Sequence, residues 1–184
     1  MTQERGRGVD RIVVRTAECP SPIGPLQLYG WSVGLLAVAL PGQDRAAVER
    51  RLFGRLAGRG RPPVTLERDE ASLADACRQL AEYFAGRRRW FDVPLDPRGT
   101  PFQLQVWEQV RRIPYGTTWS YRRLAAATRQ PEAVRAVAAA LAANPLPIVI
   151  PCHRVIGARG ELRGYAAGLA LKAWLLAHER ATAG

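Results

Sequence analysis

Residues 87–99 divide the chain into two parts with different patterns. The stretch reads RRRWFDVPLDPRG and combines prolines and a glycine with little helical periodicity, as is typical of connecting segments. Candidate strands and helices alternate before it, whereas the apolar residues after it recur mainly at helical spacing. The sequence therefore predicts an α/β N-terminal domain, including the linker, over residues 1–97 and a mainly helical C-terminal domain over residues 98–184.

The N-terminal part is predicted to form a small sheet with helices. Strands are expected at residues 12–17 and 26–40, with a turn near Gly30 interrupting the second. Helices are expected at residues 43–57 and 69–85, where apolar side chains recur every three or four positions.

The C-terminal part is predicted to contain four helices. Thr100 precedes Pro101, a combination expected at a helix start, and Ser120 is a second candidate cap. A three-residue turn at residues 128–130 would join two short helices into a candidate helix-turn-helix, although generic helical hairpins share this pattern. The helices are expected at residues 101–113, 121–127, 131–143 and 168–179. The last helix is expected to turn inward the side chains of Leu169, Trp174, Leu175 and Leu176.

Most of the positive charge lies in the C-terminal part. Residues 1–97 carry 15 arginines against 12 acidic residues, whereas residues 98–184 carry 12 basic against 4 acidic residues. Arginine is abundant throughout and Lys172 is the only lysine, a bias that explains the choice of arginine but not the scarcity of acids in one half. The distribution favours a polyanion as partner, most simply nucleic acid.

Several classes of protein are disfavoured. No apolar stretch approaches the roughly 20 residues of a membrane span, and the arginine-rich start lacks the apolar core of a signal peptide, so a soluble cytoplasmic protein is expected. The three cysteines are widely spaced and odd in number, which argues against a disulfide framework, and Cys77 is interpreted as a core residue. With no Cys-x-x-Cys pair and two histidines, neither a metal site nor a cofactor is expected.

Residues 144–157, NPLPIVIPCHRVIG, place a cysteine beside a histidine at the end of an apolar run. The short β-branched segment 146–150 is typical of a buried strand, and Pro151 would end its ladder and hold Cys152 in a fixed turn. His153 could stabilise a thiolate at Cys152. The alternative is a buried structural cysteine beside a surface histidine.

Glu179 is a candidate partner for the histidine. An acid near a helix C-terminus opposes the macrodipole unless something compensates it, so its placement suggests a role, although a solvated surface acid is equally compatible. The small-residue loop 164–168 is a candidate pocket wall or a simple turn.

Taken together, the motifs of this chain resemble those of the O6-alkylguanine-DNA alkyltransferases, also called methylated-DNA–protein-cysteine methyltransferases. IPCHRV at 150–155 is similar to the family's active-site motif, and five further segments follow its order and spacing over nearly all of residues 90–180. They are TPFQ at 100–103, IPYGTTWSY at 113–121, RAV at 135–137, ANP at 143–145 and GLALKAWLLAHE at 168–179. SPIGPL at 21–26 is a weaker match to the family's N-terminal domain.

The resemblance implies a ribonuclease-H-like N-terminal domain and a winged-helix-like C-terminal domain that contains the helix-turn-helix. It implies a DNA repair protein that transfers an alkyl group from O6-alkylguanine, with O4-alkylthymine as a second candidate lesion, irreversibly to Cys152. Each molecule would react once, without a cofactor. The expected partner is double-stranded DNA that contains O6-alkylguanine, and the expected state is a monomer with contacts between copies along DNA.

The resemblance also implies roles for individual residues. Arg135 would fill the space that the flipped guanine leaves, and Tyr121 would assist nucleotide rotation and donate a proton to guanine N3. Glu179, His153 and a bridging water would hold Cys152 as a thiolate. Asn144 would tie the turn to the recognition helix, and the further DNA-binding residues would be Ser120, Arg122, Arg123 and Ala136. The pocket residues would be Leu141, Pro147, Val155, Tyr165, Ala166 and Ala167, with backbone groups of Cys152 and Val155 reading the guanine amine.

Some positions depart from the family's common pattern. Ala138 and Ala139 stand where glycines are frequent, and their methyl groups are expected to favour the helix but to crowd its contact with the DNA groove. Ala166 and Ala167 stand where glycine or serine is frequent, and their methyl groups are expected to disfavour bulky adducts. The zinc ligands of some members are not visible.

Three other functions fit parts of the sequence. A non-catalytic lesion binder would lack the nucleophile, which Cys152 provides. A helix-turn-helix regulator could use alkylated Cys152 as its sensor. A cysteine hydrolase would require turnover from directly adjacent cysteine and histidine.

Overall fold

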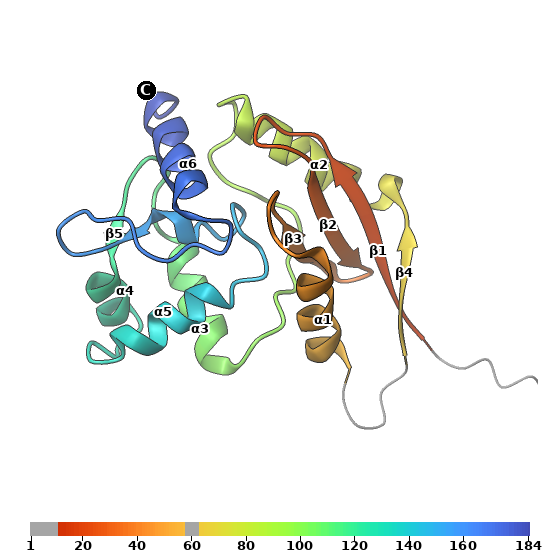
Figure 1. The fold of residues 1–184 in the computed structure, drawn as a ribbon, viewed down its shortest axis with the longest axis horizontal. Helices are drawn as coiled ribbons and strands as arrows, with labels where there is room; N and C mark the ends of the chain where they lie inside the picture. Colours follow the sequence, from red (N-terminus) through yellow and green to blue (C-terminus); the bar gives the residue numbers. More distant parts are fainter. Residues whose placement is uncertain (1–10, 58–62) are drawn as a thin grey trace, which may run out of the picture.

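The computed structural model describes residues 11–57 and 63–184. Figure 1 shows a sheet with two helices in the first half of the chain and a group of helices in the second half. The predicted fold class, a small α/β unit followed by a mainly helical unit, is confirmed.

The N-terminal half contains one four-stranded mixed sheet with the order β3-β2-β1-β4. The strands are β1 (Ile12–Cys19), β2 (Leu26–Trp31), β3 (Gly34–Ala39) and β4 (Val64–Arg68). Strands β1, β2 and β3 pair antiparallel, whereas β4 pairs parallel to β1. Strand β4 was not expected, because three of its five residues are exposed and it therefore lacks a clear apolar pattern.

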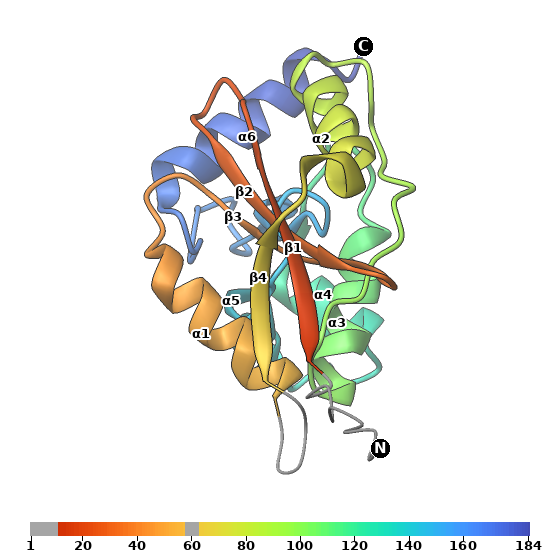
Figure 2. The ribbon, with the colours of Figure 1, turned by 90° about the vertical axis from the view of Figure 1, so that its right-hand side faces the viewer.

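A helix packs on each face of the sheet, because successive strand residues point to opposite faces. Tyr29 and Leu36 belong to a cluster with α1 (Arg45–Leu56), while Leu28 and Leu35 belong to a larger cluster that includes α2 (Glu70–Phe84). Figure 2 shows the sheet in front, with the C-terminal helices behind it. The larger cluster continues into those helices, so the two halves share one core.

The linker contributes to this joint core. Leu35 N donates to Pro94 O at 2.8 Å and Asp96 N donates to Leu35 O at 2.9 Å, so the linker runs as a short partner along β3. Val38 N donates to Pro145 O at 2.9 Å, which links the sheet to the loop before Cys152.

The C-terminal helices begin largely where the capping residues predict. Thr100 and Gln103 form a capping box at the start of α3, and the Ser120 side chain accepts from Arg123 N at the start of α4. The elements are α3 (Pro101–Arg111), β5 (Trp119–Ser120), α4 (Tyr121–Ala127), α5 (Val134–Ala142), the 3-10 turn η1 (Cys152–Arg154), β6 (Val155–Ile156) and α6 (Leu169–Ala181).

The third helix of this half begins later than expected, at Val134 instead of Pro131. Arg129 adopts a left-handed conformation with φ 59°, and Gln130 N donates to Ala125 O at 3.1 Å, so α4 ends in a Schellman motif. Residues 131 and 132 complete the turn before α5.

The apolar segment 146–150 is buried as expected, but it forms turns and not a strand. The Asn144 side chain replaces the ladder: its Nδ2 donates to Ile150 O at 2.9 Å and its Oδ1 accepts from Leu146 N at 3.0 Å. Ile148 has φ 73°, a strained conformation for a β-branched residue, and surrounding hydrogen bonds and packing hold it there.

The inward face of α6 was predicted only in part. Leu175 and Leu176 are buried, but Leu169 and Trp174 are 46% and 39% exposed. Lys172 and Glu179 occupy the inner face and are fully buried. The helix therefore turns charged side chains toward the C-terminal core.

Two of the three cysteines form a bond that the sequence did not predict. Cys19 at the end of β1 and Cys77 in α2 form a disulfide, with their Cα atoms 5.5 Å apart. The argument against disulfide bonding is therefore wrong for this pair: Cys77 packs partly buried against the core, as expected, but it also cross-links the helix to the sheet. Cys152 is free.

Candidate active site

Cys152 lies in a turn whose shape is fixed by Asn144. Cys152 begins η1, and its N–H donates to Ile150 O at 2.7 Å. Asn144 Nδ2, which also bonds Ile150 O, lies 3.2 Å from Cys152 Sγ as a hydrogen-bond donor. The residue is 9% exposed, so the sulfur is nearly buried but reachable from a cavity that it lines.

His153 and Glu179 form the core of a buried hydrogen-bond network. His153 Nε2 lies 2.7 Å from Glu179 Oε1, and both side chains are fully buried. Arg154 Nε and Nη2 contact the two carboxylate oxygens at 2.9 and 3.0 Å. Tyr83 Oη donates to Glu179 Oε1 at 2.9 Å, and Gly116 N donates to Glu179 Oε2 at 3.1 Å. Among the described residues, the carboxylate thus accepts five hydrogen bonds.

The acceptor role of the carboxylate fixes the tautomer of His153. Because Glu179 accepts, Nε2 carries the hydrogen and Nδ1 is the basic nitrogen of the neutral ring. Nδ1 is buried and has no hydrogen-bond partner among the described residues.

Burial sets the protonation states of these groups. Desolvation raises the pKa of the Cys152 thiol, although the Asn144 hydrogen bond opposes it. Desolvation lowers the pKa of His153, although Glu179 opposes it. Desolvation would raise the pKa of Glu179, but hydrogen bonds and charges from His153 and Arg154 outweigh it and lower that pKa to about 2. At neutral pH the free protein therefore holds a thiol, a neutral imidazole and a carboxylate.

Lys172 is a functional candidate that the sequence reasoning missed. Its side chain is fully buried, and Nζ donates to Val155 O and Arg163 O, each at 2.6 Å. Desolvation lowers the pKa of Lys172, and a negative charge on Cys152, once the thiolate forms, raises it. The ammonium in turn lowers the pKa of the Cys152 thiol. Its status as the only lysine in an arginine-rich chain could have drawn attention to it.

The cavity beside Cys152 has a volume of about 1410 Å³. Its walls come from α4, α5, the loop 157–166 and the start of α1. The parallel pairing of β5 with β6 (Trp119 with Val155) places the start of α4 beside the cysteine turn. The predicted site residues that line it are Tyr121, Arg122, Arg135, Ala136, Leu141, Asn144, Pro147, Cys152, Tyr165 and Ala166.

Two predicted pocket residues are not among those that line this cavity. Val155 is fully buried, and Ala167 is partly buried against the core cluster. Tyr165 lines the cavity, and its buried Oη has no hydrogen-bond partner among the described residues. Tyr121 Oη donates to Arg163 O at 3.0 Å, and desolvation raises the pKa of Tyr121, so its hydroxyl is protonated at neutral pH.

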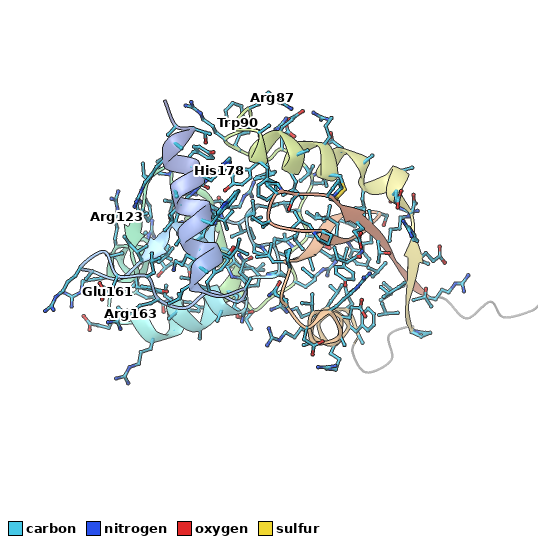
Figure 3. All side chains as sticks on the ribbon, turned by 45° about the horizontal axis from the view of Figure 1, so that its top comes forward. Arg87, Trp90, Arg123, Glu161, Arg163 and His178 are labelled. Carbon is cyan, nitrogen blue, oxygen red and sulfur yellow. A yellow bond between two sulfur atoms is a disulfide. The ribbon has the colours of Figure 1, made fainter. Side chains whose placement is uncertain are left out.

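The exposed side of α4 and α5 is basic. Arg122, Arg123 and Arg135 are exposed, as is Ala136. Arg123 stacks over the Trp119 ring at 4.3 Å, and Figure 3 shows Arg163 and Glu161 projecting from the loop before α6. Arg135 enters no ion pair with another described residue, so its guanidinium is free for an outside partner.

Residues 11–57 and 63–184 contain no group of three or more His, Cys, Asp or Glu side chains that could hold a metal ion. No helix formed by those residues is long and apolar enough to cross a membrane.

The chain matches known protein families in both halves. Residues 14–97 match the family described as 6-O-methylguanine DNA methyltransferase, ribonuclease-like domain, and residues 101–181 match the corresponding DNA binding domain. The methylated-DNA–protein-cysteine methyltransferase of Methanosarcina acetivorans is 43% identical over 157 residues, which cover 85% of this chain and 92% of the relative. The constitutive enzyme of Bacillus subtilis is 51% identical over 117 residues, 63% of this chain and 71% of the relative.

Solved structures show the same similarity. The crystal structure of Mycobacterium tuberculosis OGT in complex with DNA is 39% identical, with a TM-score of 0.74, covering 93% of this chain and 94% of the other. The crystal structure of Mycobacterium tuberculosis O6-methylguanine methyltransferase has a TM-score of 0.76 at the same identity and coverage.

Proposed function

The chain belongs to the 6-O-methylguanine DNA methyltransferase family, and from this membership we propose that it repairs DNA by moving an alkyl group from O6-alkylguanine to Cys152. The observation that carries the proposal is the position of Cys152. Its sulfur lines a cavity bounded by the basic helices α4 and α5, and its neighbour His153 is held by a buried carboxylate.

DNA is the proposed partner, bound through α4 and α5. The exposed Arg122, Arg123 and Arg135 supply positive charge for phosphates, and α5 is the proposed recognition helix. Arg135 stands at the cavity wall, where it can fill the space that a flipped guanine leaves. We propose a monomer that binds double-stranded DNA, with contacts between copies along it.

The thiolate forms during the reaction, because burial favours the thiol in the free protein. His153 Nδ1 takes the thiol proton through a bridging water, and Glu179 stabilises the resulting imidazolium. The nearby charge of Lys172 also favours the thiolate. The role proposed for Asn144 is to hold the sulfur in line with the incoming carbon through its 3.2 Å hydrogen bond.

The transfer step is a displacement at saturated carbon. Cys152 Sγ forms a bond to the alkyl carbon, the bond from that carbon to guanine O6 breaks, and its electron pair stays on the guanine. Tyr121 donates a proton to guanine N3 as the base leaves, after giving up its hydrogen bond to Arg163 O. The guanine gains one proton from Tyr121, His153 then releases the thiol proton to solvent and Tyr121 regains a proton from solvent, so the overall exchange balances. The thioether is stable, so one molecule performs one reaction.

The residues of the cavity wall are proposed to limit the size of the alkyl group that can be transferred. Tyr165 and the Ala166 amide are the proposed neighbours of O6, and the exposed Ala166 methyl group lies on the cavity wall where the family often has glycine or serine. Transfer from O6-methylguanine is therefore expected to be faster than transfer from O6-benzylguanine; comparable rates would contradict this reasoning.

Mass spectrometry tests the proposal directly. The protein is mixed with a duplex that contains one O6-methylguanine, and intact and peptide masses are measured beside the Cys152→Ser variant. One added methyl on Cys152 with one equivalent of restored guanine, and no transfer to the variant, is the expected result. Tight binding without transfer would instead identify a lesion-recognition protein, and release of more than one equivalent would identify a turnover enzyme.

A further inference from the structure

Tyr83 carries a hydroxyl from the N-terminal half of the chain into the network around Glu179. It lies near the end of α2, and its Oη donates to Glu179 Oε1 at 2.9 Å across 96 positions of sequence. Both side chains are fully buried. The same carboxylate oxygen contacts His153 Nε2 at 2.7 Å, so the tyrosine and the histidine share one acceptor atom.

The direction of this hydrogen bond is fixed. Desolvation raises the pKa of Tyr83 well above its ordinary value, and the charge of Glu179 raises it further, so the phenol keeps its proton. Glu179 is ionised at neutral pH and accepts. A donor on Oε1 draws electron density from the oxygen that faces His153 and reduces the carboxylate's ability to stabilise an imidazolium.

The ring of Tyr83 is held in place from both halves of the chain. It packs edge-on against Phe84 at 5.3 Å and Tyr115 at 5.9 Å, and lies 5.5 Å from the His178 ring. His178 Nε2 also contacts Tyr83 O at 3.0 Å, and Figure 3 shows His178 on α6 facing α2. The hydroxyl therefore cannot leave Glu179 without a shift of α2 against α6.

We propose that Tyr83 is a positioning residue through which the N-terminal half sets the orientation and basicity of His153. The proposal rests on the proposed alkyl transfer, because His153 is the group that receives the thiol proton in that reaction. It gives the N-terminal half a part in the chemistry beyond packing support: α2 must be docked for Oε1 to have its full set of donors.

The Tyr83→Phe variant removes the hydroxyl and keeps the ring. Two effects are expected. The carboxylate loses one donor and becomes less well fixed, so the single-turnover transfer rate at pH 7 should fall by about tenfold, as at metal-bound histidines that lose an outer partner. The remaining negative charge on Oε1 also stabilises the protonated form of His153, so the acid limb of the rate profile should move to higher pH.

Tyr29→Phe is the matched control. Tyr29 is fully buried in β2 and its Oη donates to Glu49 Oε1 at 2.8 Å, so this variant also loses a tyrosine–carboxylate hydrogen bond, but in the cluster around α1. Single-turnover rates are measured from pH 5 to 9 at saturating duplex, and duplex affinity is measured separately. A Tyr83→Phe profile that coincides with the Tyr29→Phe profile would overturn the proposal.

A second readout does not depend on alkyl transfer. The chain has two histidines, His153 and His178, and a His178→Gln variant assigns their imidazole ¹⁵N signals. The titration of His153 should move to higher pH in Tyr83→Phe and stay in place in Tyr29→Phe. 3-Fluorotyrosine at position 83 has nearly the same shape as tyrosine and is a stronger hydrogen-bond donor, so it should move the His153 titration to lower pH. It provides the test if the phenylalanine variant does not fold. If these shifts occur but the protein transfers no methyl group, the proposed function is wrong and the coupling of Tyr83 to His153 is supported. If the His153 titration does not move, the coupling is overturned.

Discussion

The Cys19–Cys77 disulfide should contribute strongly to stability, because it closes a long loop in the unfolded chain. The bonded residues are 58 positions apart. In the chain-entropy description, a cross-link over about 58 residues removes roughly 14 cal/mol/K from the unfolded state, or about 4 kcal/mol at 25 °C. Reduction should therefore lower the free energy of unfolding by about 4 kcal/mol, a large part of the 5–15 kcal/mol typical of a domain.

Urea unfolding measures this difference. A Cys152→Ser background leaves the two cysteines of the bridge as the only thiols, and the oxidised protein is compared with the reduced protein. With a slope of about 2 kcal/mol per molar urea, the midpoint should fall by about 2 M on reduction. The control is the Cys19→Ala/Cys77→Ala variant, which lacks the cross-link and should unfold close to the reduced protein and be insensitive to reductant.

Two results would refute this reasoning. A midpoint shift below about 0.5 M would mean that the unfolded chain already keeps β1 and α2 close, so that the bridge removes little entropy. Titration of three free thiols in the denatured, purified wild-type protein would mean that the bridge does not form at all.

Three other perturbations have directions that the structure fixes. The pKa of Glu179 is about 2 in the folded protein, which is below its value in the unfolded chain. The carboxylate therefore adds about 3 kcal/mol to the free energy of unfolding above pH 4.5, and this stability is lost as the pH falls toward 2. Glu179→Gln should make the free energy of unfolding less dependent on pH in that window. Lys172→Met removes the lysine donor from the buried Val155 O and a charge that favours the Cys152 thiolate, while Arg163 O keeps the Tyr121 hydroxyl as a donor. Thermal unfolding should show a loss of about 2 kcal/mol, and iodoacetamide should alkylate Cys152 more slowly at pH 8. Arg135→Ala should weaken duplex binding in a fluorescence titration and slow alkyl transfer. The melting temperature should not change, because the Arg135 side chain is exposed and enters no ion pair with another described residue. An unchanged duplex affinity would show that Arg135 is not part of the DNA interface.

The sequence predicted the parts of the site that depend on local chain order. Pro151, Cys152 and His153 are neighbours, and the caps at Thr100 and Ser120 fixed the helix starts because each cap bonds within three residues. The place of Glu179 at a helix C-terminus made it a candidate partner of His153, 26 positions away, and the resemblance to a known family supplied its expected role. These predictions required no knowledge of how the two halves pack.

Long-range partners were not predictable in the same way. Tyr83 reaches Glu179 across 96 positions, and the two bridge cysteines are 58 positions apart; nothing near either residue indicates its partner. The prediction of a strand at residues 146–150 was wrong for a related reason. Its β-branched composition favours a strand, but the Asn144 side chain supplies the hydrogen bonds of a ladder and lets the segment turn.

The position of Glu179 shows how the fold accommodates a charge that its helix disfavours. An acid in the last turn of α6 opposes the macrodipole and, when fully buried, would also lose its hydration. The donors that offset both costs come from separate segments: Tyr83 in α2, Gly116 after α3, and His153 and Arg154 in η1. The carboxylate is fully satisfied only when the halves are docked, so the histidine beside the nucleophile acquires its orientation from the assembled molecule and not from the C-terminal half alone.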